Sequence, residues 1–186
     1  METSKSIEII ESMYKESKRS LHRNSFYFIL WGLLLVPAGI AEYLFIESEK
    51  AYMVWPIVGI VGGIVAGIYG FREGKRAGAQ TVGDRIYNYT WGAFIALLIL
   101  SLPLSFKYDF SPHILILMLA GYATFVSGGI AKFTPFILGG MALVAGSLLC
   151  AYVVELPYHG LVFAASILLG YVIPGFMLRN QENGQA

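Results

Sequence analysis

The sequence has few charged residues, which make up only 13% of its 186 positions. Soluble domains average about 25% charged residues. Hydrophobic residues account for 56% of the chain. This balance excludes a disordered chain, a coiled coil and a nucleic-acid-binding protein, and it argues against a soluble enzyme because one core could not bury so much apolar surface. A polytopic membrane protein remains, with membrane lipids as its first partners.

Cysteine is almost absent, because Cys150 is the single one in the sequence. A lone cysteine excludes a disulfide within the chain and a thiolate metal site. Cys150 lies inside an apolar run, which is typical of a small packing residue.

Long apolar runs are abundant, and six of them approach the 20 residues that a membrane-spanning helix requires. They show no alternation of apolar and polar residues, so they predict helices and not the strands of a barrel. The sequence therefore predicts an all-α integral membrane protein, a bundle of six transmembrane helices. Pro37, Pro103 and Pro174 lie inside the runs and are expected to kink them. The six runs are Phe26–Ile46, Met53–Phe71, Tyr89–Phe106, Pro112–Ala131, Pro135–Val154 and Gly160–Leu178.

Lysine and arginine are distributed unevenly between the two sides that six crossings define. Of the 13 in the sequence, only Lys50 and Lys107 fall on the side opposite the termini. The positive-inside rule then places both termini in the cytoplasm. We expect a cytoplasmic segment over 1–24, a transmembrane domain over 25–179 and a cytoplasmic tail over 180–186.

Two cytoplasmic segments are candidates for contact with lipid or protein. Apolar residues recur at helical spacing over 4–24, which predicts an amphipathic helix lying on the inner membrane surface. This helix is interpreted as an orienting anchor, with docking of a cytoplasmic protein partner as the alternative. The connection over 72–88 predicts a basic, mobile loop near anionic headgroups. It lacks the glycine and lysine spacing of a phosphate-binding loop.

Short motifs recur along the chain and suggest a repeat of helical pairs. Trp31-Gly32 and Trp91-Gly92 stand near the starts of two odd-numbered runs, and Gly139-Gly140 occupies the matching place in a third. The pattern predicts three parallel helical hairpins, arranged around a pseudo-threefold axis.

Glycines at four-residue spacing mark the second run at Gly59, Gly63 and Gly67. Small residues along one stripe allow two helix backbones to approach closely. We interpret this stripe as packing within the monomer, with the seam of a homo-oligomer as the alternative.

The middle third of each run has no Asp, Glu, Lys, Arg or His. This argues against a carrier coupled to protons or sodium through a buried carboxylate. Candidates for a solute pathway are polar or small-polar side chains at or near mid-depth, namely Tyr122, Thr124, Ser127 and Tyr171.

Ionisable residues gather instead near the predicted outer ends of the runs. Two histidines and three carboxylates fall there: His113, His159, Glu42, Glu155 and Asp109. Such a set offers the nitrogen and oxygen ligands of a zinc site or an acid–base pair. The alternative, which we favour, is an ordinary polar surface at the membrane boundary. Zinc is the only cofactor for which the sequence offers a set of candidate ligands.

The start of the chain resembles a group of small uncharacterised bacterial polytopic membrane proteins. The motifs that carry the resemblance are Ser6–Met13, Asn24-Ser25-Phe26 and Phe28–Gly32, all within residues 1–45. The resemblance implies a bacterial cytoplasmic membrane, and the group supplies no catalytic residues.

Three classes of function follow, in order of preference. The first is a small transporter or channel for an unidentified solute. The second is a non-catalytic membrane sensor or partner subunit, which would use residues 4–24 and the loop over 72–88. The third is a membrane enzyme or metal-binding protein that uses the His/carboxylate set. Because this class ranks last, a catalytic role is less favoured than a non-catalytic one.

Overall fold

The structure is a computed structural model of the chain, and it describes residues 25–48, 51–76 and 82–183. These residues contain helices and no strands, as the sequence predicts. In chain order the elements are α2 (Ser25–Leu44), η1 (Ala51–Met53), α3 (Val54–Arg76), α4 (Val82–Lys107), α5 (Pro112–Ile130), α6 (Thr134–Tyr152), η2 (Leu156–Tyr158), α7 (His159–Ile167), η3 (Leu168–Val172) and α8 (Ile173–Asn183).

Six helical segments within the described part of the chain are long and apolar enough to cross a membrane. Each coincides with one of the six predicted runs, and the sixth combines η2, α7, η3 and α8 into Leu156–Gln181. The prediction of six apolar helices is therefore confirmed. Their length and composition are those of a multi-pass membrane protein.

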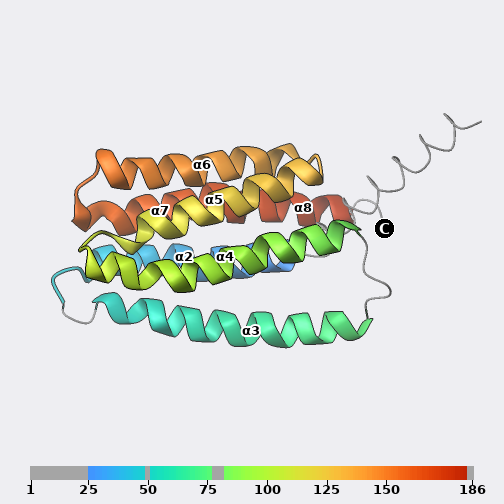
Figure 1. The fold of residues 1–186 in the computed structure, drawn as a ribbon, viewed down its shortest axis with the longest axis horizontal. Coiled ribbons are helices and arrows are strands. Elements are labelled where there is room, and N and C mark those ends of the chain that lie inside the picture. The colour runs from blue at the N-terminus through green and yellow to red at the C-terminus, as the bar shows by residue number, and fades with distance from the viewer. Residues whose placement is uncertain (1–24, 49–50, 77–81, 184–186) are drawn as a thin grey trace, which may run out of the picture.

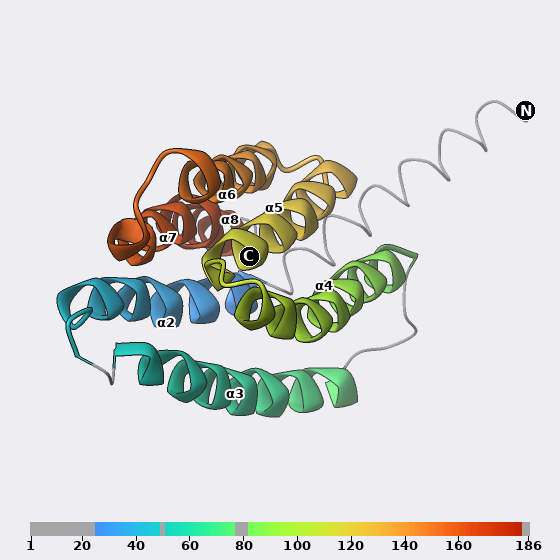
Figure 2. The ribbon, with the colours of Figure 1, turned by 60° about the vertical axis from the view of Figure 1, so that its left-hand side comes forward.

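The helices run side by side along the long axis of the molecule (Figure 1). The C-terminal end of α2, the connection from α4 to α5 and the connection from α6 to α7 all lie at one end of the bundle, which we call the His113 end. Figure 2 shows α3 along one edge, next to α2, with α6 on the far side. This common end brings together residues that are far apart in the sequence.

The most extensive helix pairing joins α5 to α6, followed by α2 with α7. Glycine explains the first pairing, because a Cβ on Gly140 would lie 2.6 Å from the backbone nitrogen of Phe125 and 2.8 Å from the carbonyl oxygen of Gly121. Both leading pairs join helices of different predicted hairpins, although α2 also packs against α3 and α4 against α5. The three-hairpin arrangement stays a prediction.

The predicted glycine stripe of α3 packs against no other helix of the described part of the chain. A Cβ on Gly59, Gly63 or Gly67 would meet no atom of the described residues within 4 Å. The glycines of α3 that face α2 are Gly62, against Trp31, and Gly70, against Tyr27. The interpretation of the stripe as packing within the monomer is wrong for the described residues. The three glycines lie on a face of α3 that does not contact α2. A homo-oligomer seam stays a prediction.

The basic connection is shorter than predicted. Helix α3 continues to Arg76 and α4 begins at Val82, so both helices extend into the predicted loop over 72–88. Asp84 lies in the first turn of α4, where a carboxylate stabilises the positive end of the helix. The proposed amphipathic helix over 4–24 lies outside the described residues.

The sixth apolar segment is not a regular α-helix throughout. Between α7 and α8 the five residues Leu168–Val172 form a π-helical turn. Pro174, two residues after this turn, has no N–H for an α-helical bond, so the predicted kink takes the form of a local change in helical winding. Pro37 and Pro103 lie inside α2 and α4.

Aromatic side chains form the core at the opposite end from His113. The ring of Phe28, which is buried, lies 4.1 Å from the ring of Phe136 and 5.4 Å from that of Tyr171. The ring of Trp91 packs edge-on to Phe28 at 5.5 Å. This cluster joins α2, α4, α6 and η3.

Candidate functional site

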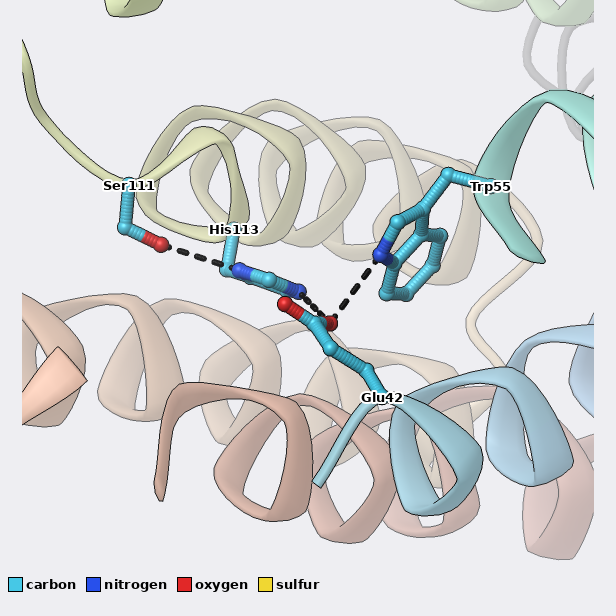
Figure 3. Close-up of polar contacts among 4 residues, drawn as sticks. All are labelled: Glu42, Trp55, Ser111 and His113. Atoms are coloured by element: carbon cyan, nitrogen blue, oxygen red, sulfur yellow. Dashed lines mark hydrogen bonds and ion pairs between the residues drawn. The ribbon is translucent and has the colours of Figure 1, made fainter. Parts of the chain in front are cut away.

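The candidate site is a buried polar cluster at the His113 end of the bundle, formed by Glu42, Trp55, Ser111 and His113 (Figure 3). Glu42 stands in the last turn of α2, and the residue is only 4% exposed. Close approach of α7 encloses it, since a Cβ on Gly160 would lie 2.6 Å from the carbonyl oxygen of Gly39 and 3.4 Å from Oε2 of Glu42. Two small residues therefore allow α7 to cover a carboxylate.

Two donors from different helices converge on one oxygen of Glu42. Nε2 of His113, near the start of α5, lies 2.9 Å from Oε2. Nε1 of Trp55, near the start of α3, donates to the same atom at 3.0 Å. A buried carboxylate is costly unless such partners compensate it. The cluster thus ties the ends of α2, α3 and α5 together.

Ser111 completes the chain of hydrogen bonds on the far side of the imidazole. Its Oγ lies 2.9 Å from Nδ1 of His113. A hydroxyl both donates and accepts, so it donates to Nδ1 of a neutral imidazole and accepts from Nδ1 of a cationic one. The cluster is hydrogen-bonded in either protonation state of His113.

Aromatic rings surround the imidazole and fix its position. The rings of Trp55 and Phe163 each lie 5.1 Å from that of His113 in edge-to-face geometry. Trp55 and Phe163 also meet edge-on at 5.1 Å. Rigid aromatic walls lower the cost in entropy of holding His113 in one orientation.

His159, the first residue of α7, is buried beside this cluster, with its ring 6.4 Å from that of His113. Its Nε2 lies 3.0 Å from the carbonyl oxygen of Val154. A carbonyl only accepts, so the ring proton of a neutral His159 is on Nε2. Nδ1 is buried and has no hydrogen-bond partner among the described residues.

The five sequence candidates for metal binding are thus divided. Glu42 and His113 are in contact and His159 is adjacent, whereas Asp109 and Glu155 are exposed. Asp109 occupies the turn before α5 with a φ of 53°. Within the described ranges, no group of three or more His, Cys, Asp or Glu side chains is placed to hold a metal ion.

The four pathway candidates lie in two different environments. Thr124 and Ser127 are buried and donate to carbonyl oxygens of their own helix, those of Ala120 and Ala123. Tyr171 is buried in η3, close to the side chain of Thr124. Tyr122 is 62% exposed on the outside of the bundle.

Sequence reasoning missed Ser111 and Trp55 as members of the site. A tryptophan near the end of an apolar run, such as Trp55, is most simply explained as an anchor at the membrane boundary. Ser111 stands two residues before His113, but a serine ahead of Pro112 is most simply explained as a helix cap. Only the fold reveals their partners.

No known protein family, curated protein or solved structure matches the chain.

Proposed function

We propose that the chain is a multi-pass membrane protein that acts as a sensor, in which proton binding at the pair Glu42–His113 controls how firmly the helix ends are held together. The observation that carries this proposal is the 2.9 Å contact between two buried ionisable side chains of α2 and α5. Ionisable groups buried in membrane proteins are rare and are functional candidates by default.

The chemistry of the cluster supports a reversible change of charge. Histidine is the side chain that changes charge under physiological conditions. Because Ser111 accommodates either state, a proton can be added to His113 without leaving a buried group unpaired. The added charge turns the hydrogen bond between Nε2 and the carboxylate of Glu42 into an ion pair between two oppositely charged side chains. The link between α2 and α5 is then firmer when His113 is protonated.

The surroundings of the pair make α3 the responsive element. His159 of α7 is the titratable side chain that faces His113 across 6.4 Å, and Trp55 is the donor that α3 contributes. Helix α3 packs mainly against α2 and η1. At this end Trp55 also attaches it, through the bond to Glu42 and ring contacts with His113 and Phe163. A change in the charge of Glu42 or His113 therefore alters how α3 is held.

The distribution of lysine and arginine supports an orientation in which the His113 end faces away from the cytoplasm. Both termini are then cytoplasmic, and the protons sensed are those of the extracytoplasmic side. We further propose that the protein lies in a cytoplasmic membrane and that it signals to a partner through residues 4–24.

Fluorescence of Trp55 tests the proposal, because its indole donates to Glu42 and its ring packs on His113. In a Trp31→Phe, Trp91→Phe background, the emission of Trp55 is expected to change in one sigmoidal step as the pH is lowered and His113 takes up a proton. The step is lost in His113→Gln and kept in His159→Gln. An unchanged step in His113→Gln, or a flat titration of the parent protein, would overturn the proposal.

Transport of a small solute, the preferred expectation from the sequence, is a second candidate. The π-helical turn Leu168–Val172 favours it, because such turns in helices are frequent at functional sites and broken helices line the sites of many transporters. This turn carries the buried Tyr171, which lies close to Thr124.

Accessibility of Thr124 separates this candidate from the first. In a Cys150→Ala background, a Thr124→Cys variant is expected to react with a membrane-impermeant methanethiosulfonate if a water-filled path reaches the π-helical turn. Glu155→Cys, at an exposed position, provides the positive control. Failure of Thr124→Cys to react while Glu155→Cys reacts would contradict transport along this path.

A further inference from the structure

We infer that Ser111, His113 and Glu42 form a Ser–His–Glu relay, which makes Oγ of Ser111 a nucleophile toward carboxylic esters. This goes beyond proton sensing and depends on a separate atom. Oγ of Ser111 lies 2.9 Å from one ring nitrogen of His113, and Oε2 of Glu42 lies 2.9 Å from the other. Nucleophile, base and carboxylate thus stand in the order that a triad requires, and triads are recognised by geometry and role.

The hydroxyl of Ser111 hydrogen-bonds the imidazole of His113 and does not cap helix α5. Ser111 is the N-cap residue of α5, with extended backbone angles, and serine at this place normally caps the first turn with its side chain. Here the side chain makes no capping bond. A ring nitrogen that accepts the hydroxyl proton is the arrangement that activates a serine.

The carboxylate of Glu42 holds the second ring nitrogen of His113, as a Ser–His–Glu relay requires. Glu42 accepts from Nε2 of His113, which leaves Nδ1 as the acceptor for the proton of Ser111. Trp55 donates to the same carboxylate oxygen and limits its rotation. A carboxylate so placed fixes the tautomer and stabilises the imidazolium that forms during reaction.

The start of α5 lies beside the nucleophile. This helix of 19 residues begins at Pro112, directly after Ser111. The amides of a first helical turn have no acceptor within the helix, and the helix dipole is positive there. Since Pro112 has no N–H, the backbone amide of His113 is the donor available to a developing oxyanion.

Apolar side chains at this end of the bundle define the substrate class. Leu44, Phe45 and Tyr108 are large and more than half exposed at the connections beside the cluster. Such exposed apolar groups would contact the acyl chain of a substrate that approaches from this end, so we expect an amphiphilic ester.

The reaction balances without a cofactor. Oγ of Ser111 attacks the ester carbonyl carbon as its proton moves to Nδ1 of His113, and the carbon–oxygen bond to the alcohol breaks as His113 returns that proton to the leaving oxygen. Water then attacks the acyl-serine and gives a proton to His113. Release of the carboxylic acid restores the proton to Ser111, so ester and water become acid and alcohol.

Covalent labelling with an alkyl fluorophosphonate tests this inference in the full-length protein in detergent. One adduct, located at Ser111 by peptide mass spectrometry, is expected in the parent protein. It is absent in Ser111→Ala, and its rate of formation falls at least about 100-fold in His113→Gln. Ser105→Ala, which removes another buried serine, is the matched control and keeps the adduct.

Failure of the parent protein to react, or an adduct that persists in Ser111→Ala, would overturn the inference. Circular dichroism of each variant verifies that it is folded. The pH titration of Trp55 in Ser111→Ala separates the two proposals. A lost adduct is expected together with a fluorescence step that persists but moves to lower pH, because Nδ1 of the protonated imidazole loses its acceptor. A parent protein with the step and no adduct would support proton sensing and contradict the relay.

Discussion

Nε2 of His113 and Oε2 of Glu42 lie 2.9 Å apart although the two residues are 71 positions apart in the sequence. Both side chains are buried. Glu42 is the only Asp, Glu, His, Lys or Arg in α2, and His113 is the only one in α5. The two meet because α2 ends and α5 begins at the same end of the bundle. The pair is the physical basis of both proposals, and its removal has measurable consequences.

Replacing Glu42 by alanine is expected to lower the free energy of unfolding by about 3–5 kcal/mol, the typical cost of removing one partner of a buried pair. The change leaves Nε2 of His113 and Nε1 of Trp55 without their acceptor. Unfolding by SDS titration in mixed micelles measures the loss. Glu155→Ala, at an exposed carboxylate, is the control and stays within about 0.5 kcal/mol of the parent.

Replacing Gly140 by alanine is expected to destabilise the pairing of α5 and α6 by about 1–3 kcal/mol, because the added methyl would meet the backbone of Phe125 at 2.6 Å. Gly63→Ala is the matched control, since its Cβ would meet open space. The same SDS titration compares the two variants. A loss at Gly63 equal to that at Gly140 would contradict the environment that the fold assigns to Gly63.

Replacing Ser147 by alanine tests a hydrogen bond between helices. Oγ of Ser147 in α6 donates to the carbonyl oxygen of Ile114 in α5 at 2.7 Å. Such bonds in membrane proteins contribute about 0.6 kcal/mol on average, and we expect a loss of this size. Ser101→Ala removes a serine bonded to its own helix, at Leu98, and should cost less. Equal losses would argue that the bond to Ile114 adds nothing.

The orientation of the chain is tested by two cysteine variants in a Cys150→Ala background. Glu155→Cys lies in the connection at the His113 end, and Arg179→Cys lies in α8 toward the other end. A membrane-impermeant maleimide is expected to label the first in intact spheroplasts and the second only after lysis. Labelling of both from one side would contradict six crossings.

The positions of the six helices follow from the sequence because lipid provides no hydrogen bonds to a backbone, so a long apolar run has to be helical. Pro174 likewise marks the place where the sixth segment departs from α-helical winding. The extent of the loop over 72–88 was not predictable in the same way. Its glycines and charges are typical of a connection, yet helical bonds continue through much of it because each added residue contributes one.

The sequence by itself determined that this protein consists of apolar helices and that its ionisable residues stand near helix ends. The tertiary structure alone decided which of those residues meet. Asp109 and Glu155 are as polar as Glu42, but only Glu42 lies where Gly39 and Gly160 let two helices close over a carboxylate. The physical reason is that hydropathy acts along the chain, whereas a hydrogen bond requires two atoms within about 3 Å, a distance that helix packing sets.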